Sequence, residues 1–176
     1  MRKLRTIEME RLSVDEFRQA EKMPLTVVLD DVRSMHNVGS VLRTADTFRV
    51  TEVVLCGITG TPPHPEIHKT ALGAEDSVSW RYVASVVEVV NQLKASGYTV
   101  LSVEQAEGST LLPAFQPEPG RQYAIVLGNE VKGVHQEVID LSDACLEIPQ
   151  LGTKHSLNVS VTAGIVIWHF ARQLLF

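Results

Sequence analysis

The sequence has only two cysteines, Cys56 and Cys145, among 176 residues. So low a content excludes a small scaffold held together by disulfides. Each cysteine lies at the end of or inside an apolar, strand-like run, where a buried small thiol is favoured over a disulfide or a metal ligand. The chain also lacks an apolar stretch long enough for a signal peptide or a membrane span, so we expect no membrane association and a cytoplasmic protein.

Positive charge is scarce as well. Lys and Arg number 16 against 21 Asp and Glu, which gives a net charge of −5. Since phosphate contacts need Lys and Arg, an acidic chain cannot hold a nucleic acid by its overall charge, and any such surface must be local. The one short basic cluster consists of Arg2, Lys3 and Arg5. The hydrophobic share of 44% and charged share of 21% are ordinary for a globular domain.

Apolar strand-like runs alternate with amphipathic helical segments along the chain. Strands are expected at 25–29, 52–56, 80–83, 98–103, 123–127 and 145–148, and helices at 13–22, 37–48, 85–96, 134–141 and 157–175. Ser13 and Glu16 form a capping box for the first helix, and Asn37 is expected to cap the second. This alternation predicts an α/β fold, a mostly parallel sheet with helices on both faces. We expect a helical extension over residues 1–24 and one domain over 25–176.

Ligands of such sheets bind in the loops beyond the carboxyl ends of the strands. Two of these loops carry short polar patterns, Asn37-Val-Gly-Ser-Val-Leu-Arg43 and Gly128-Asn-Glu-Val-Lys-Gly133. The first alone is typical of a helix cap followed by a surface arginine. In the second, two glycines bracket a carboxylate, which suits a bend around a ligand. Neither is a phosphate-binding fingerprint, so a nucleotide phosphate is not the implied ligand.

The third loop, from Ile148 to Gly164, is the most informative, because it passes from a strand through a long polar loop into an otherwise apolar helix. Asn158 and Ser160 are poor choices for the start of a core helix unless their side chains have another role. The pattern reads I-P, then S-L-N-V-S-V.

Together these loops resemble the three motifs of the SpoU family of SPOUT RNA methyltransferases, N-x-G-x-x-x-R, G-x-E-x-x-G and I-P…S-L-N-V-S-V, in the family's order. The resemblance covers the chain from about Leu25 to its carboxyl end. It implies a catalytic domain over 25–176 with a C-terminal trefoil knot, an S-adenosylmethionine site in the knot, and a homodimer that buries the C-terminal helix. A knot runs against the general rule for protein chains and is expected here from the resemblance alone.

The resemblance also implies site residues and a reaction, the transfer of a methyl group to a ribose 2′-hydroxyl of RNA. The cofactor is expected on Val103, Leu127, Gly128, Ile148, Ser156 and Leu157. Catalysis is expected to involve Arg43, Glu130 and Asn158, with Asn37 and Ser156 in support. A guanidinium stays protonated at physiological pH, so Arg43 cannot be an ordinary base. Either an RNA phosphate takes the proton, or Arg43 stabilises the developing alkoxide.

Other interpretations are weaker. His64-Pro-Glu-Ile-His68 spaces two histidines like a zinc motif, but the acid is misplaced and Pro62, Pro63 and Pro65 should break any helix around His64, so we expect no metal. These histidines, with Lys69, could instead face RNA. A nonenzymatic RNA-binding module is the main alternative to the enzyme, and a dehydrogenase is disfavoured by the missing fingerprint. A minimal domain with a basic amino-terminal helix favours tRNA slightly over rRNA, and the sequence does not identify the nucleotide.

Overall fold

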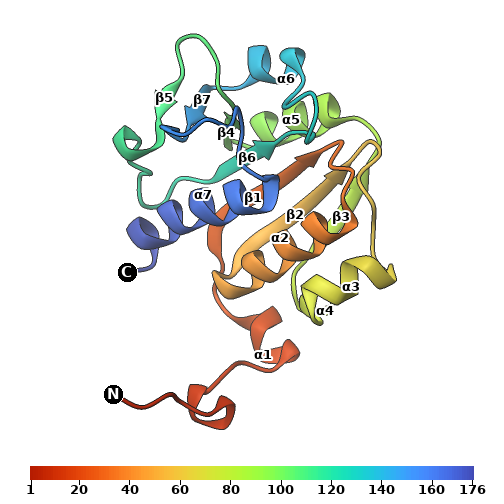
Figure 1. Ribbon diagram of the computed structural model, residues 1–176, viewed down its shortest axis with the longest axis vertical. Helices are drawn as coiled ribbons and strands as arrows, with labels where there is room; N and C mark the ends of the chain where they lie inside the picture. Colours follow the sequence, from red (N-terminus) through yellow and green to blue (C-terminus); the bar gives the residue numbers. More distant parts are fainter.

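The computed structural model describes residues 1–176, except for the side chains of residues 6 and 7, as one body built around a single sheet (Figure 1). The strands are β1 (Met23–Asp30), β2 (Val50–Cys56), β3 (Trp80–Val83), β4 (Thr99–Val103), β5 (Thr110–Leu111), β6 (Tyr123–Leu127) and β7 (Ala144–Glu147). Their order is β3-β2-β1-β6-β4-β7-β5, and neighbouring strands are parallel. The predicted α/β class is confirmed.

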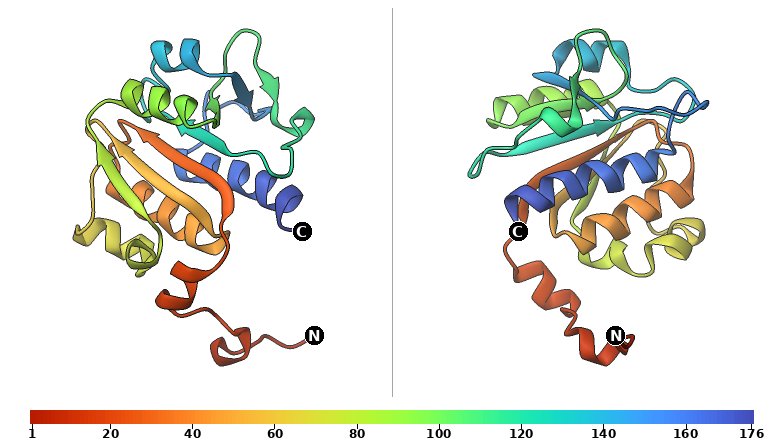
Figure 2. Two further views of the ribbon diagram at one scale, coloured as in Figure 1. Left: turned by 180° about the vertical axis from the view of Figure 1, so that it is seen from behind. Right: turned by 60° about the vertical axis from the view of Figure 1, so that its left-hand side comes forward.

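Helices cover both faces of the sheet, as expected. The helical elements are η1 (Thr6–Met9), α1 (Val14–Gln19), α2 (Met35–Thr47), α3 (Pro65–Ala71), α4 (Ala74–Ser77), α5 (Val86–Ala95), η2 (Leu112–Ala114), α6 (Gln136–Leu141) and α7 (Val159–Leu174). Helices α2 and α7 lie side by side on one face, and α5 and α6 lie on the other (Figure 2). None of the helices in the described residues is long and apolar enough to cross a membrane.

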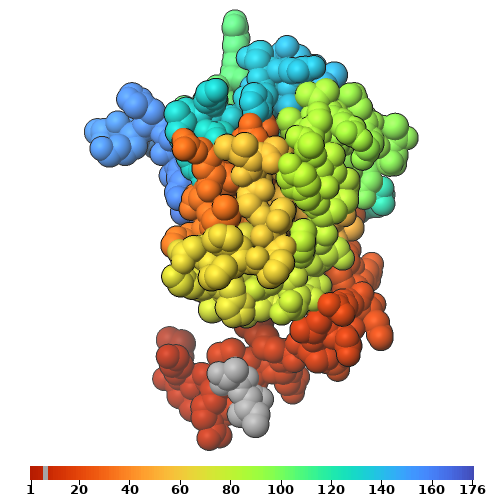
Figure 3. Space-filling model, turned by 90° about the vertical axis from the view of Figure 1, so that its right-hand side faces the viewer, coloured from red at the N-terminus to blue at the C-terminus, as the bar shows by residue number. Residues whose placement is uncertain are grey.

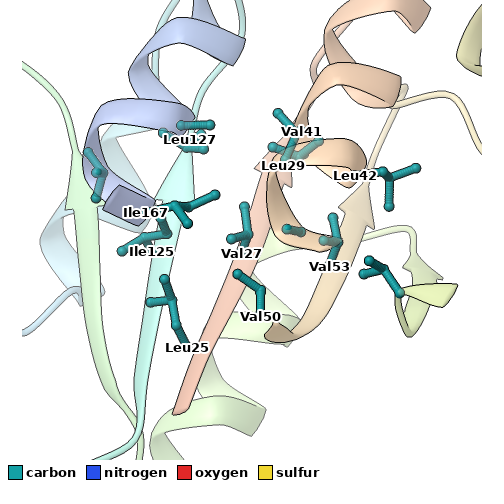
Figure 4. Close-up of a cluster of buried hydrophobic side chains, with 14 of the residues drawn as sticks. Leu25, Val27, Leu29, Val41, Leu42, Val50, Val53, Ile125, Leu127 and Ile167 are labelled. Carbon is teal, nitrogen blue, oxygen red and sulfur yellow. The ribbon is translucent and has the colours of Figure 1, made fainter. Parts of the chain in front are cut away.

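The core divides into two clusters because successive side chains of a strand point to opposite faces. Leu25, Val27 and Leu29 of β1 pack toward α2 and α7, together with Ile167 (Figure 4). Val28, from the same strand, belongs to the cluster under α5 and α6. All of β1 except Pro24 is buried, which explains why its sequence is a continuous apolar run rather than an alternating one.

The second helix begins earlier than its sequence predicts. Ser34 caps α2, and its Oγ accepts a hydrogen bond of 3.3 Å from the backbone N–H of Asn37. The prediction that Asn37 caps this helix was therefore wrong, because the helix begins two residues before Asn37 and Ser34 is its cap. The Asn37 side chain lies within the first turn and is available for other contacts. The capping box of Ser13 and Glu16 is confirmed, although α1 ends at Gln19 rather than at residue 22.

Four short helical elements, η1, α3, α4 and η2, and the short strand β5 were not expected. The prolines were predicted to break any helix around His64, but α3 begins at Pro65, where a missing N–H costs nothing, and His68 lies inside it. His64 is the cap, and its Nδ1 accepts a hydrogen bond of 3.2 Å from the N–H of Glu66. The strand β5 has two residues at the sheet edge.

The residues before β1 form a separate projection, seen in red below the body in Figure 3. The projection is anchored where Phe17 of α1 enters the main core and where Arg18 donates a hydrogen bond of 2.7 Å to the carbonyl oxygen of Asp76. The division into an extension over 1–24 and a catalytic domain over 25–176 stays a prediction, as does the trefoil knot.

Candidate active site at the carboxyl edge of the sheet

The three sequence motifs come together at one edge of the sheet. The loops that follow β1, β6, β4 and β7 all leave the carboxyl ends of parallel strands, which share an edge. A pocket of about 1060 Å³ opens there between the loops after β4, β6 and β7 and the start of α7. Its size is that of a site for a small molecule.

All six residues predicted to hold the cofactor line this pocket, and they come from three separate segments. They are Val103, Leu127, Gly128, Ile148, Ser156 and Leu157. Val103 is paired in register with Leu127 on one side and Leu146 on the other, so three apolar side chains form adjoining parts of the floor. Ser156 and Leu157 are exposed and belong to the rim. The pocket therefore combines an apolar floor with a polar rim.

Glu130, from the second motif, is tied to the loop before α2. Its carboxylate accepts hydrogen bonds from the backbone N–H groups of Arg33 at 3.0 Å and Ser34 at 3.1 Å. The amide nitrogen of Asn37 donates a third, also of 3.0 Å. The glutamate thus binds the donors at the amino end of α2, which favour a negative charge. Two loops that are far apart in the sequence are joined by one side chain.

Asn37 extends this contact to the third motif. Its side-chain oxygen accepts a hydrogen bond of 3.1 Å from the amide nitrogen of Asn158. Asn158 also caps α7, because its side-chain oxygen accepts a bond of 2.9 Å from the N–H of Ser160. Glu130, Asn37 and Asn158 therefore form a hydrogen-bonded chain with one member from each motif. The unusual asparagine before the last helix has both a capping role and a link to the site.

The charge of Glu130 is maintained by this network. Partial burial by itself would raise the pKa of the carboxyl group, but the hydrogen bonds from Arg33, Asn37 and Ser34 outweigh it and lower the pKa below its usual value. Glu130 is therefore a carboxylate at neutral pH. An ionised acceptor of this kind suits a positioning role better than proton donation.

Two predicted site residues, Arg43 and Asn37, do not line the pocket in the part of the chain that the structure describes. Arg43 is exposed on α2, six residues beyond Asn37. Its guanidinium can therefore meet a ligand that arrives from solvent. Glu130, Asn158 and Ser156 do line the pocket, so the structure brings most of the predicted catalytic set together and leaves Arg43 outside it.

The second motif needs its glycines for close packing. A Cβ at Gly128 would lie 2.1 Å from the backbone carbon of Gly133 and the backbone nitrogen of Val134. Gly133 has a φ of 70°, which is the left-handed region that glycine adopts at no steric cost. The loop closes on itself through a pair of backbone hydrogen bonds between Asn129 and Gly133, of 3.0 and 2.9 Å.

Two polar residues at this edge were missed by the sequence analysis. Asn129 donates a hydrogen bond of 2.7 Å to the carbonyl oxygen of Asp31, and its side-chain oxygen accepts bonds from Val131 and Lys132. Glu104, directly after β4, lines the pocket and accepts a hydrogen bond of 3.1 Å from the N–H of Val134. Their positions, two residues after β6 and directly after β4, were the available signal.

Three of the histidines pair with carboxylates. His36 lies 2.8 Å from Glu66, and His68 lies 2.5 Å from Glu75, so these imidazoles pair with carboxylates near α3. His135 lies beside two aspartates, Asp30 and Asp31, which do not line the pocket. Its Nδ1 is 2.8 Å from the buried carboxylate of Asp30, and one ligand atom each from Asp30, Asp31 and His135 lie within 4.8 Å of one another. This grouping joins residues about 100 positions apart.

Comparison with known proteins agrees with the geometry. A family model described as the SpoU rRNA Methylase family matches residues 24–168. The chain is 31% identical over 168 residues to a tRNA (guanosine(18)-2′-O)-methyltransferase of Thermus thermophilus, covering 96% of this chain and 84% of that protein. It is 30% identical over 159 residues to a 23S rRNA (guanosine-2′-O-)-methyltransferase of Neisseria meningitidis, covering 90% of this chain but only 62% of that protein.

Solved structures share the fold. A rRNA methyltransferase from Sinorhizobium meliloti with bound AdoMet superposes with a TM-score of 0.82 at 26% identity, over 91% of this chain and 61% of that chain. A TrmH/SpoU tRNA modifying enzyme of A. aeolicus gives a TM-score of 0.80 at 24% identity, over 91% of this chain and 81% of that one. At 24% identity, the likeness to the A. aeolicus enzyme concerns the fold alone.

Proposed function

Because the chain belongs to the SpoU rRNA methylase family, we propose that it is an RNA methyltransferase that uses S-adenosylmethionine to methylate a ribose 2′-hydroxyl. The observation that carries this proposal is the hydrogen-bonded chain of Glu130, Asn37 and Asn158, which joins the three motifs at the pocket. A nonenzymatic module that kept only the fold would not need three polar side chains from three loops to meet beside a ligand-sized pocket. Both named relatives above are 2′-O-methyltransferases.

The pocket fits the proposed cofactor. An adenine ring needs an apolar surface, which Val103, Leu127 and Ile148 provide, and polar substituents need the hydrogen-bonding groups that the rim offers. When bound, S-adenosylmethionine supplies an activated methyl group. The chain's own part is to hold the loop of Glu130 and the start of α7 in a fixed relation, because alignment of the reacting groups accounts for much of the rate of a transfer reaction.

Arg43 is the proposed activator of the ribose hydroxyl. Its guanidinium stays protonated, so it acts by charge, stabilising the oxygen anion that develops as the hydroxyl loses its proton. A phosphate of the bound RNA is the alternative proton acceptor. The exposed position of Arg43 on α2 supports a contact with RNA rather than with the floor of the pocket.

We propose tRNA as the substrate slightly ahead of rRNA. The Thermus relative, of which the chain covers 84%, acts on tRNA, whereas the Neisseria relative, covered over 62%, acts on rRNA. The basic cluster Arg2, Lys3 and Arg5 lies on the projecting extension, where it is accessible to a large RNA. We also propose a homodimer through the exposed apolar face of α7, and a cytoplasmic location.

The decisive experiment measures methyl transfer from labelled S-adenosylmethionine to bulk tRNA and bulk rRNA, followed by mapping of 2′-O-methylated positions in cells with and without the protein. We expect label in one RNA class and the loss of a methylated ribose in the deletion strain. Cofactor and RNA binding without transfer to either class would favour the nonenzymatic RNA-binding module.

A further inference from the structure

Glu104 is an acidic residue in the pocket that belongs to none of the three motifs and takes no part in the network of Glu130. It follows β4 directly, and its backbone N–H donates a hydrogen bond of 3.0 Å to the carbonyl oxygen of Leu146. One carboxylate oxygen accepts the N–H of Val134 at 3.1 Å, and the other accepts the N–H of Gln105 at 2.8 Å. Both oxygens are therefore fixed in place at the wall of the pocket.

The carboxylate also sets the shape of the second motif. A Cβ on Gly133 would lie 2.1 Å from Oε2 of Glu104, so the loop approaches this carboxylate as closely as only a glycine allows. The side chain is wedged between the end of β4 and the turn that closes the pocket. Such rigidity is what a residue needs if it is to recognise a ligand by fixed hydrogen bonds.

Two acceptor positions on this carboxylate are left. An ionised carboxylate offers about four lone-pair positions, and the two backbone donors occupy one on each oxygen. One free position on each oxygen matches a ligand that presents two adjacent hydroxyl groups. The vicinal hydroxyls of a ribose are such a pair, and an acidic side chain after a strand recognises ribose in this way in dinucleotide-binding folds.

The strand order indicates which part of the cofactor lies near Glu104. The catalytic groups Asn37, Glu130 and Asn158 gather at the amino end of α2, which follows β1, whereas β4 is separated from β1 by β6. Glu104 is thus on the side of the pocket away from these groups. Its neighbours there, Val103 and Ile148, offer the apolar surface that an adenine ring needs. The adenosine, rather than the amino-acid tail, suits this side.

We propose that Glu104 binds the ribose hydroxyl groups of the adenosine of the cofactor. This assignment rests on the proposed function, because it takes S-adenosylmethionine and its product to be the ligands of the pocket. It gives Glu104 two tasks, since the same carboxylate holds the backbone of Val134 and so fixes the turn of the second motif. A role limited to the turn would leave the discrimination between ribose and deoxyribose ligands unchanged.

The test compares three affinities by calorimetry. The ligands are S-adenosylhomocysteine, its 2′-deoxy analogue and a deaminated analogue that lacks the α-amino group of the amino-acid tail. The wild-type protein should bind the parent compound about tenfold or more tightly than the 2′-deoxy analogue, which is the expected loss of a hydrogen bond to a charged group. In Glu104→Gln this ratio should fall toward one, because the amide keeps the shape but has one acceptor. Glu118→Gln, which removes an exposed charge outside the lining of the pocket, should keep the wild-type ratio.

An unchanged ratio in Glu104→Gln, with all ligands weakened equally, would overturn the ribose contact and leave only the role in the turn. A change confined to the deaminated analogue would place Glu104 at the amino-acid tail and would overturn it as well. Failure of the wild-type protein to bind any of the three ligands would instead contradict the proposed function itself. Thermal unfolding of each variant shows whether the fold is retained.

Discussion

Single side chains at this site act mainly by satisfying backbone groups of a neighbouring loop. Glu130 binds two N–H groups before α2, and Asn129 binds the carbonyl of Asp31. Each contact ties the loop before α2 to the loop of the second motif. The arrangement of the proposed catalytic groups therefore depends in part on contacts that do not involve a substrate.

Arg43→Ala should reduce catalysis without emptying the cofactor pocket, because Arg43 lies on α2 outside the pocket lining. Loss of one preorganised electrostatic contact typically lowers turnover by roughly 10² to 10³-fold. Turnover with a proven RNA substrate and cofactor affinity by calorimetry should both be measured. Asn158→Ala is the contrasting variant, since its loop borders the pocket and both quantities should change. Wild-type turnover in Arg43→Ala would contradict the catalytic role and leave Arg43 as an ordinary surface residue.

Glu130→Gln should destabilise the protein in a pH-dependent way. The folded-state pKa of Glu130 is lowered, because hydrogen bonds outweigh the effect of burial, so its carboxylate stabilises the fold above the usual glutamate value of 4.5. That contribution is lost as pH falls below 4.5 toward the lowered pKa. We expect a loss of about 1 kcal/mol at pH 7, which shrinks in acid.

Urea unfolding of the wild-type protein and of Glu130→Gln at several pH values measures this difference. Glu21→Gln is a suitable control, since that glutamate is exposed and lies before β1. A difference that stays constant from neutral to acidic pH would show that the ionised form of Glu130 has no special role in stability.

At the scale of elements, close contacts between helices depend on small residues. Gly39 lies on α2 where α3 crosses it, and a Cβ there would be 2.2 Å from both the carbonyl oxygen of Ile67 and the hydroxyl of Thr70. Gly39→Ala should therefore push α3 away and lower the free energy of unfolding by about 1–3 kcal/mol, despite the better helix propensity of alanine. Ser40→Ala, the next residue of α2, adds no atom and should cost less. Chemical denaturation compares the two, and equal stabilities would mean that α3 shifts freely.

The sequence predicted elements well where their pattern was long and periodic. Strands such as β6 are continuous apolar runs, and α7 is a mostly apolar helix of sixteen residues. Their hydrophobic pattern alone makes them recognisable in the sequence. Helix α3 has seven residues and starts at a proline, and β5 pairs only two residues, so local pattern has little to detect. The capping of α2 by Ser34 instead of Asn37 was missed because both residue types cap helices and both lie near the start of the helical segment.

The candidate site could be predicted only in part, for a related reason. Four of the residues predicted to hold the cofactor lie at strand ends, Ser156 and Leu157 lie just before α7, and the structure gathers all six in one pocket. The hydrogen bond between Asn37 and Asn158 spans 121 positions, and that between Asn37 and Glu130 spans 93, so no local pattern contains them. Glu104 was missed because a single carboxylate after a strand has no distinctive spacing.

At the scale of the whole molecule, an acidic chain that binds RNA, as proposed, must do so through local cations. Arg2 and Arg5 lie on the projecting extension, although both are close to the carboxylate of Glu8, at 2.7 and 3.7 Å. Replacing Arg2, Lys3 and Arg5 with alanine should weaken RNA binding and reduce the slope of log affinity against log salt by up to about 3. Titrations at several salt concentrations measure both effects. An unchanged slope would place the RNA-binding surface on another part of the chain.

The oligomeric state is the remaining property of the whole molecule. Val161, Ile165 and Trp168 are spaced along one face of α7 and are 50%, 37% and 47% exposed, although the rest of this helix packs into the core. Trp168 also packs against Phe48 and Phe176, with ring centroids 5.6 and 5.9 Å apart, so the apolar surface extends beyond the helix. A contiguous exposed apolar patch of this kind typically marks a surface that another protein covers.

Trp168→Glu should therefore convert a dimer into a folded monomer, because a charge at the centre of the patch would have to be buried without a partner. Light scattering over a range of concentrations should give twice the chain mass for the wild-type protein and the single-chain mass for the variant. Val14→Glu places the same charge on an exposed apolar residue of α1, away from α7, and should leave the dimer intact. A monomeric wild-type protein would refute the predicted dimer, and a dimeric Trp168→Glu variant would move the interface to another face.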